Sequence, residues 1–586
     1  MARDPDEGDA FVFDLVDDDA AAGAASAGPA GPDGAGADGA GADGADADGT
    51  DATDGPGGTG PAEADPAASG SPGRRRRATA QVAAVLAVVL GTGLAVESMQ
   101  DHARIERMRA IPGGVADVSS PLEETWAWHG AVGPGGGTTE VAVLGDVLAF
   151  ESDGELVALD PATGEEAWTV ELREDAECGP TAAPFRSDLV TSSLVCLQGK
   201  GAEREVIVVG PRGAASPPRA LDATDTRRHG PPRVGPDGTV LRAERVGPLS
   251  AIDVTGARCT DGGECTGTVE SGRDLVLRAE DAATGTERWT VTVPFRPADA
   301  MQCARTFGGS WSGSENRLVF SGALAPDAFG GWASPDRIDL NGCGIQAGVT
   351  PRGAVLGTEL EPGTGNVTSL GAGRYAVSSF AGAVRASLHA PDGDVVGEVT
   401  GYPLAPLATD AVEPTTLLAV DEPGRRLRAY GPDGTPRWDI TLQSSGQEFL
   451  AQVGDTAVVT TGAGSVRGLD LATGAEQWDW GGSRPAAGGD GGYFGTVYVA
   501  QAFTDGESVL LLIEGESGGA ESLVALDAVS GAVVWERSGG GETDVFGPAD
   551  GGPADGDPPG QDISGYLAAV DGYLLEVAPG GVRGLG

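Results

Sequence analysis

Residues that could carry chemistry are few in this chain and widely scattered. No histidine has a second ligand at metal-binding spacing, and the sequence has no Gly-x-Ser-x-Gly elbow, His-Glu-x-x-His motif or P-loop. The Asp-Gly clusters at 391–394 and 431–434 are typical of hairpin turns, whereas a calcium loop supplies six or more oxygen ligands. We therefore expect no enzymatic activity, no metal and no cofactor. The four histidines are His102, His129, His229 and His389.

The six cysteines favour disulfides over a metal site. Their number is even and their spacing does not form a tetrahedral zinc set, so three disulfides in an oxidising compartment are expected. Six cysteines allow fifteen pairings, and we favour nearest neighbours because these would staple the longer insertions. The favoured pairs are Cys178 with Cys196, Cys259 with Cys265, and Cys303 with Cys343.

A repeated phrase is the strongest signal in the sequence. Residues 156–168 read Leu-Val-Ala-Leu-Asp-Pro-Ala-Thr-Gly-Glu-Glu-Ala-Trp, and close copies occupy 466–478 and 523–535. A looser copy spans 276–289 and a turn variant spans 427–438. Each copy combines an apolar strand, an Asp-x-x-Thr-Gly turn and a second strand that ends near tryptophan. Repeated units of short strands, each unable to bury its own faces, predict the blades of a β-propeller.

These residues resemble the quinoprotein-like β-propeller repeat of PQQ-dependent alcohol dehydrogenases and of the outer-membrane assembly lipoprotein B family. The resemblance spans roughly residues 120–586, with three strong units and two partial ones. It implies that the tryptophan ending each unit docks against the neighbouring blade. The expected docking residues are Trp168, Trp289, Trp438, Trp478 and Trp535.

The PQQ-dependent relatives hold their quinone with an adjacent pair of cysteines, a stacking tryptophan, and Glu, Asn and Asp around Ca²⁺. This chain has no Cys-Cys pair, and no family ligand falls on a matching position. Trp311 and Trp332 lie outside the repeat pattern and are interpreted as packing residues. No PQQ-binding residue is therefore assigned.

The last unit is incomplete, which suggests how the ring closes. Residues 582–585 read Val-Arg-Gly-Leu, the same residues that stand in mid-unit at 466–469, and the segment containing Trp126 and Trp128 resembles the missing outer strand. We expect that strand to pair with the C-terminal strand that ends near Leu585, which would remove free sheet edges. Counting every candidate unit, including weaker ones at 185–222, 316–360 and 373–400, gives nine. We expect an all-β propeller with eight blades (seven to eight), one candidate being an elaboration of its neighbour.

Composition places limits on partners. The formal net charge is −49 and the isoelectric point is about 4.2, so a nucleic-acid partner is not expected. Residues 1–73 are mostly Ala, Gly, Asp and Pro and predict an acidic disordered tail. One apolar island in this tail is interpreted either as incidental sequence or as a docking motif for a cytoplasmic partner. Its apolar residues include Phe11, Phe13 and Leu15.

Residues 74–96 predict a basic flank followed by a single transmembrane helix. Four arginines precede the uncharged stretch 78–96, which would span about 28 Å as a helix. The flanking arginines predict a cytoplasmic N-terminus and an extracytoplasmic propeller. A cleaved signal peptide is the competing interpretation, although its n-region would exceed 70 residues. Residues 97–119 are expected to form a stalk, and 120–586 the propeller domain.

The sequence favours a membrane-anchored binding or scaffold module in the cell envelope, with a protein or glycan partner on the propeller. The alternative is a PQQ-dependent oxidoreductase. A third hypothesis is a transmembrane sensor that links an outside ligand to the tail.

Overall fold

The computed structural model describes residues 101–586, apart from 112, 134–140, 174–175, 182–188, 201–203, 261–263, 309–316, 321–322, 381–383, 422–424, 443–447, 462–464, 482–497, 515–519, 539–565 and 579. The chain divides into two compact units, residues 1–82 and 83–586, and every described residue belongs to the second. The acidic tail, its motif Phe11, Phe13 and Leu15, and the expected membrane span 78–96 all lie outside the described residues. Within the described part of the chain, no helix has the length and apolar character needed to cross a bilayer.

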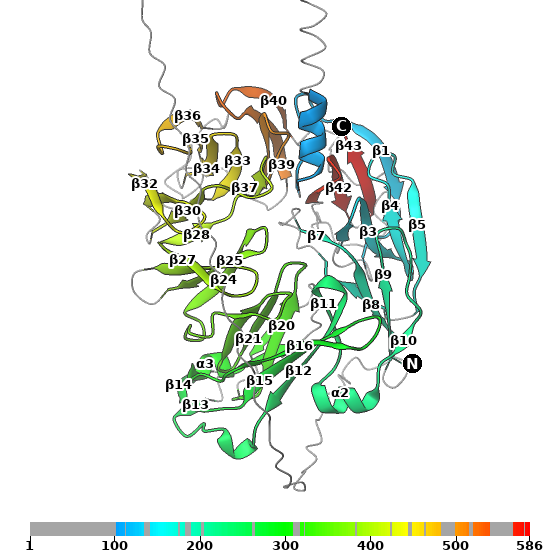
Figure 1. The fold of residues 1–586 in the computed structure, drawn as a ribbon, viewed down its shortest axis with the longest axis vertical. Helices are drawn as coiled ribbons and strands as arrows, with labels where there is room; N and C mark the ends of the chain where they lie inside the picture. Colours follow the sequence, from blue (N-terminus) through cyan, green and yellow to red (C-terminus); the bar gives the residue numbers. More distant parts are fainter. Residues whose placement is uncertain are drawn as a thin grey trace, which may run out of the picture. The chain divides into compact units, whose positions relative to one another are not determined.

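The described chain is all-β and forms successive sheets of four strands, as the repeats predict (Figure 1). Sheets 1 to 3 come first in the chain. Sheet 1 comprises β2 (Val141–Leu144), β3 (Val147–Ser152), β4 (Glu155–Leu159) and β5 (Glu166–Glu171), with a short fifth strand β7 (Val190–Thr191). Sheet 2 comprises β6 (Glu177–Gly179), β8 (Leu194–Gln198), β9 (Glu205–Val209) and β10 (Arg219–Ala220). Sheet 3 comprises β11 (Arg233–Gly235), β12 (Thr239–Val246), β15 (Asp274–Asp281) and β16 (Glu287–Val293).

Sheets 4 to 6 follow in chain order. Sheet 4 comprises β20 (Phe329–Ala333), β21 (Ile338–Gly342), β22 (Ile345–Val349) and β23 (Val355–Leu356). Sheet 5 comprises β24 (Gly365–Gly371), β25 (Arg374–Ser379), β26 (Arg385–His389) and β27 (Val395–Thr400). Sheet 6 comprises β28 (Tyr402–Leu404), β30 (Leu417–Val420), β31 (Arg426–Tyr430) and β32 (Pro436–Thr441).

The last three sheets contain the two most regular repeats and the closing sheet. Sheet 7 comprises β33 (Phe449–Val453), β34 (Thr456–Thr460), β35 (Val466–Asp470) and β36 (Glu476–Trp480), with a short fifth strand β29 (Ala408–Thr409). Sheet 8 comprises β37 (Tyr498–Thr504), β38 (Ser508–Glu514), β39 (Ala520–Asp527) and β40 (Val533–Ser538). Sheet 9 comprises β41 (Tyr566–Val570), β42 (Tyr573–Ala578), β43 (Gly581–Leu585) and β1 (Glu124–His129).

Two insertions interrupt this series. One separates sheets 2 and 3 and contains helix α2 (Ala223–His229); the 3₁₀ turn Pro236–Gly238 joins β11 to β12. The other surrounds sheets 3 and 4 and contains the 3₁₀ turn Leu249–Ala251 and helix α3 (Ala300–Cys303). Its strands are β13 (Ala257–Cys259), β14 (Cys265–Val269), β17 (Ala298–Asp299), β18 (Arg305–Gly308) and β19 (Arg317–Phe320).

The described residues thus form nine sheets of four or five strands, one more than the eight expected. The weaker candidates at 185–222, 316–360 and 373–400 contribute to sheets 2, 4 and 5 respectively, so none is a mere elaboration of its neighbour. Their outer strands lack the tryptophan that marks the strong units, which is why the sequence pattern gave them little weight.

Apolar packing joins each sheet to the next. Nine clusters of buried side chains each span two consecutive sheets, and the cluster of Val143, Leu148 and Val577 joins sheet 9 back to sheet 1. Successive residues in one strand face opposite neighbours: Leu148 packs toward sheet 9, whereas Ala149 packs toward sheet 2. The strands are therefore apolar on both faces because each sheet is covered on both sides, and the series of sheets closes on itself.

The Asp-x-x-Thr-Gly turns have the geometry that their residues predict. The Asp160 carboxylate accepts hydrogen bonds from the backbone N–H groups of Ala162 and Thr163, at 2.9 and 3.0 Å. Gly164 follows with φ +70°, a conformation in which a Cβ is unfavourable. The ring of Trp126 also covers this glycine so closely that a Cβ would have no room. The turn therefore forms a flat platform for an aromatic ring.

Six tryptophans on outer strands dock onto the following sheet in the same way. Each indole Nε1–H donates to a backbone carbonyl at 2.8–3.2 Å, and five of the rings cover a positive-φ turn glycine. The hydrogen bond fixes the polar edge of the indole while its face excludes water from the seam. The pairs are Trp126 with Pro161, Trp168 with Pro211, Trp289 with Pro351, Trp438 with Leu471, Trp478 with Ala528 and Trp535 with Val118.

Sheet 9 contains both ends of the folded domain. Strand β1 pairs antiparallel with β43, so that Trp126 lies opposite Gly584 and Trp128 opposite Val582 (Figure 1). Just outside the strands, Glu123 and Gly586 exchange two backbone hydrogen bonds of 2.9 and 3.0 Å. The N-terminal strand therefore supplies the outer strand that the C-terminal repeat lacks.

The segment expected to act as a stalk contacts the propeller. Residues 101–109 are helical, and Arg104 donates to the backbone carbonyl of Asp505 at 3.0 Å and lies 3.6 Å from its buried carboxylate. The same carboxylate accepts a hydrogen bond from the Val118 N–H. Arg109 donates to the Tyr573 hydroxyl and lies over its ring. This segment therefore fastens sheet 8 to sheet 9.

A buried carboxylate lies in sheet 9 near the closure. Glu576 on β42 is 4% exposed, and one of its oxygens has no hydrogen-bond partner among the described residues. Its pKa is raised to about 7, chiefly by burial; Arg583 on β43 and Arg537 on β40 oppose the rise, and Glu124 on β1 adds to it. The folded protein therefore holds this proton more tightly than the unfolded chain does.

Deleting residues 101–130 should lower the free energy of unfolding by several kcal/mol, because sheet 9 would lose its outer strand and Trp535 its acceptor. The measurement is chemical denaturation of residues 101–586 against residues 131–586. Equal stability of the two proteins would contradict strand closure.

The Glu576→Gln variant should remove part of the pH dependence of stability. Because the folded pKa is raised, the contribution of Glu576 is fully present below its unfolded pKa and is lost as pH rises from about 4.5 through about 7. Relative to wild type, the variant should gain on the order of 2 kcal/mol between pH 4.5 and pH 8. Denaturation curves measured across this range provide the test, and parallel stability profiles would contradict it.

Candidate functional site

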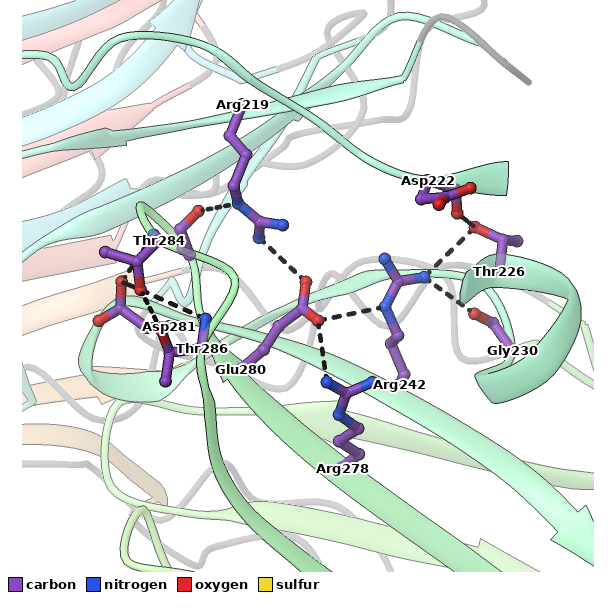
Figure 2. Close-up of polar contacts among 11 residues, drawn as sticks. Arg219, Asp222, Thr226, Gly230, Arg242, Arg278, Glu280, Asp281, Thr284 and Thr286 are labelled. Atoms are coloured by element: carbon purple, nitrogen blue, oxygen red, sulfur yellow. Dashed lines mark hydrogen bonds and ion pairs between the residues drawn. The ribbon is translucent and has the colours of Figure 1, made fainter. Parts of the chain in front are cut away.

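At the seam between sheets 2 and 3, charged side chains occupy positions that are apolar in sheet 1. In sheet 1, the side chains that face the preceding sheet include Phe150, Val157 and Leu159. In sheet 3, Arg242 and Arg278 are cross-strand partners, and they correspond to the partners Phe150 and Val157 of sheet 1. Glu280 corresponds to Leu159, because each directly precedes the aspartate of its turn. We call Arg219, Arg242, Arg278 and Glu280 the ionic seam; it lies between sheets 2 and 3 (Figure 2).

Arg219 takes over the contacts that an indole makes elsewhere. Its Nε donates to the Ala282 carbonyl at 2.7 Å, the carbonyl that corresponds to Pro161 in the first turn. Its guanidinium also lies against Gly285, the positive-φ glycine of the same turn. Arg219 is not at the tryptophan position of the repeat, since strand β10 is only two residues long and begins later. The same docking geometry is therefore achieved by a charged group.

Glu280 lies at the centre of three guanidinium groups. Its Oε1 accepts a hydrogen bond from Arg219 Nη2 at 2.9 Å, while its Oε2 lies 3.7 Å from Arg242 Nε and 4.0 Å from Arg278 Nη2 (Figure 2). Arg278 also pairs with the exposed Glu287 at 3.1 Å. Glu280 and Arg242 are 2% and 1% exposed, so the central charges are almost completely removed from water.

Helix α2 covers the ionic seam. Asp222 caps its N-terminus by accepting from the Thr224 N–H, and Gly230 ends it with φ +86°. Arg242 Nη1 reaches this helix and donates to the Thr226 hydroxyl and the Gly230 carbonyl, both at 3.3 Å (Figure 2). The helix thus provides two acceptors for the buried Arg242 guanidinium.

The electrostatics of the seam are those of a desolvated cation cluster. Burial lowers the pKa of Arg242, and Glu280 and Asp225 oppose that shift. A second ionic group lies between the same two sheets, where the Glu177 carboxylate is 3.1 Å from Arg204 and 4.0 Å from Arg233. Burial also lowers the pKa of Arg233. Guanidinium groups of this kind hold anions; they do not supply a nucleophile or a general base.

The site residues predicted from the sequence have structural roles. Trp168, Trp289, Trp438, Trp478 and Trp535 dock between sheets, and Trp126, Trp128 and Leu585 lie in the closing sheet. His229 lies 3.5 Å from Glu244, and His389 contacts Ser387 and the Gly393 carbonyl. Trp332 is on β20, and Trp311 lies outside the described residues. Among the residues that the structure describes, no cluster of His, Cys, Asp and Glu has metal-binding geometry.

The cysteines form three disulfides in the nearest-neighbour pairing. Cys178–Cys196 joins β6 to β8, and Cys259–Cys265 joins β13 to β14. Cys303–Cys343 ties α3 to the turn after β21. The last two disulfides hold the insertion around sheets 3 and 4 in place.

Sequence reasoning missed the ionic seam. One signal was available in the looser repeat copy at 276–289. Glu280 stands where the three close copies have leucine, and Arg278 stands where two of them have valine and one has arginine. Comparing repeats position by position would have flagged the glutamate. Arg219 and Arg242 could not be placed beside it, because neither lies in the part of the repeat that the pattern covers.

Replacing Glu280 alone should be far more damaging than replacing it together with Arg242 and Arg278. Glu280→Leu leaves three guanidinium groups without their shared carboxylate and should reduce the free energy of unfolding by about 3 kcal/mol. Combining it with Arg242→Phe and Arg278→Val installs the side chains of sheet 1 and should recover most of this loss. Urea denaturation of both variants tests the coupling, and additive losses would contradict it.

Comparisons with known proteins found one protein family and several solved structures that are similar to the chain. The family described as outer membrane protein assembly factor BamB matches residues 381–545, a little over a quarter of the chain. No curated protein matches it significantly. Similar solved structures include BamB from Moraxella catarrhalis (12% identity, 79% of this chain and 99% of that chain, TM-score 0.33) and the computationally designed Ika8 protein (11%, 78% and 99%, 0.32). Another is quinohemoprotein alcohol dehydrogenase from Comamonas testosteroni (11%, 79% and 76%, 0.28). The chain carries a β-propeller of PQQ-like repeats, similar in residues 381–545 to the BamB family.

Proposed function

We propose that this chain is a membrane-anchored, extracytoplasmic binding module whose propeller holds a protein partner in the cell envelope. The matching family is described as an assembly factor, which supports a scaffold role rather than a catalytic one. The fold supports the same view, because its strongest sequence features, the tryptophans and turn glycines, are used to hold the sheets together.

The observation that carries the extracytoplasmic location is the set of three disulfides. All six cysteines pair, and no free cysteine is found in the described part of the chain. Disulfides of this number persist in oxidising compartments and are rare in the reducing cytosol. Export of the propeller is also what the four arginines before the apolar stretch 78–96 favour.

The N-terminal helix supports an anchoring role for the segment before it. Only residues 97–100 separate the proposed span from the helix at 101–109. That helix is held by Arg104 and Arg109, which contact sheets 8 and 9. A membrane anchor attached here would hold one side of the propeller close to the membrane. The remaining surface would then be available to partners, as suits a scaffold.

The location predicts the redox state of the cysteines in cells. After acid quenching and alkylation of free thiols in intact cells, the full-length chain should carry no alkyl groups on cysteine. It should gain six after reduction under denaturing conditions, as mass spectrometry would show. Protease added to spheroplasts should also remove the propeller. Six alkylated thiols before reduction, together with protection from protease, would refute an extracytoplasmic propeller.

The binding role predicts that PQQ does not bind the purified full-length protein. Titration with PQQ in the presence of Ca²⁺, followed by quenching of tryptophan fluorescence, should show no saturable component, since no quinone-binding residues were identified. A PQQ-dependent dehydrogenase provides the positive control. Saturable quenching with one site per chain would favour the oxidoreductase over the scaffold.

A further inference from the structure

The seam between sheets 5 and 6 lacks the docking side chain that positions most of the other seams. Gly397 on β27 stands at the position of the docking tryptophan, as the register of β26 with β27 and of β31 with β32 shows. The backbone of the next turn takes the place of the indole, because a Cβ on Gly397 would clash with the Asp433 carbonyl oxygen. Two backbones therefore meet here, where a flat ring lies in the tryptophan seams.

A groove lies beside this backbone contact. It has a volume of about 560 Å³ and is lined by residues of β27, β31 and β32, together with Gly434 of the turn. Small-ligand sites in proteins typically measure about 300–1,000 Å³. Two of the lining side chains, Glu398 and Arg437, are exposed, so the groove is open to solvent. It is therefore both large enough and accessible enough to take a ligand.

Charged side chains of both signs line the groove. Glu398 comes from β27, Arg428 from β31, and Arg437 and Asp439 from β32. Asp439 is paired with Arg426 at 2.7 Å. Among the residues that the structure describes, Arg428 and Arg437 donate to a carbonyl and a hydroxyl without forming an ion pair, and the Glu398 side chain has no hydrogen-bond partner. Donors and an acceptor thus remain for a ligand.

The charge balance of the groove favours a neutral ligand. Its lining holds two guanidinium groups and two carboxylates, so neither an anion nor a cation is attracted by a net local charge. A guanidinium only donates hydrogen bonds and an ionised carboxylate only accepts them, so a ligand that fits both must offer acceptors and donors. A hydroxyl group offers both through one oxygen, and a saccharide carries several hydroxyls on a rigid ring.

An extended peptide fits this groove less well. Peptides often bind by adding a strand to a sheet edge, which requires free backbone N–H and C=O groups. On β27, the Tyr430 hydroxyl accepts from the Thr400 N–H at 3.1 Å and donates to the Thr400 carbonyl at 3.0 Å. Gly434 lies against the backbone of Glu398. This part of the edge is therefore occupied, and side chains remain as the groups that recognise a ligand.

We propose that the groove between sheets 5 and 6 binds a neutral oligosaccharide. Sugar hydroxyls donate to the Glu398 carboxylate and accept from the guanidinium groups of Arg428 and Arg437, which gives charge-assisted hydrogen bonds without a net charge on the ligand. The absence of a docking ring at Gly397 distinguishes this seam from the tryptophan seams, so the site belongs to one place in the ring.

This inference goes beyond the proposed protein-binding role, and the two can fail separately. The cysteine and protease experiments decide the location of the propeller, and the PQQ titration addresses the oxidoreductase. Saccharide binding is measured on the purified chain and depends on neither result.

The test uses an array of immobilised trisaccharides and short unmodified peptides, probed with the purified full-length chain. The trisaccharides are built from neutral hexoses, from N-acetylhexosamines or from uronic acids. Wild type should bind at least one neutral trisaccharide more tightly than any uronic acid trisaccharide and any peptide. Binding to none of the neutral trisaccharides would overturn the proposal, as would a preference for uronic acids or for peptides.

Variants place the binding in the groove. Glu398→Gln and Arg428→Gln should each weaken binding of the preferred neutral trisaccharide at least tenfold, because each removes a charge-assisted hydrogen bond. The matched control is Glu536→Gln: Glu536 follows Trp535 on β40 as Glu398 follows Gly397 on β27, and its replacement should leave binding unchanged.

The melting temperature of each variant shows whether it folds as wild type does. If Arg428→Gln lowers it, Arg437→Gln on the exposed strand β32 replaces that variant. Unchanged affinity in the groove variants, or an equal loss in Glu536→Gln, would overturn the proposal.

Discussion

The fold depends on the contact that joins each sheet to the next. Every sheet has two apolar faces and cannot bury either alone, so stability arises only when the neighbours are in place. At seven of the nine described seams, an outer-strand tryptophan or Arg219 donates a hydrogen bond to a backbone carbonyl that sets the position of the docked pair. In six of these seven contacts, a positive-φ glycine lets the ring or guanidinium lie flat. Small errors in the turn would therefore shift the whole of the next sheet.

The last seam connects distant parts of the chain, which makes the ring a single cooperative unit. The Trp535 indole donates its hydrogen bond to the Val118 carbonyl, in the segment that precedes β1. The other docking tryptophans donate to a turn between two strands of the next sheet. Asp505 holds the same segment through the Val118 N–H and Arg104. Because sheets 8 and 9 cannot be completed until this segment is bound, the N-terminal residues of the domain determine whether its C-terminal sheet is stable.

Much of this architecture could be predicted from the sequence, since the tryptophans and Asp-x-x-Thr-Gly turns report local geometry directly. The number of sheets could not, because three sheets have outer strands without tryptophan and their packing depends on residues distant in sequence. Gly397 illustrates the difficulty: it stands at the tryptophan position of sheet 5, where the backbone of Asp433 approaches too closely for any side chain. A glycine at that point carries no visible repeat signal.

The candidate site was hidden for a related reason. Arg219, Arg242 and Glu280 come from three strands, and each is an ordinary charged residue when viewed alone. Only the strand register shows that Arg242 and Glu280 stand at positions that are apolar in sheet 1. Since the ring already has apolar contacts at that seam through Val195, Val240 and their neighbours, the charged group adds specificity of position more than stability. A propeller whose neighbouring sheets are already joined by apolar contacts can vary the charged residues of such a seam without disturbing its closure.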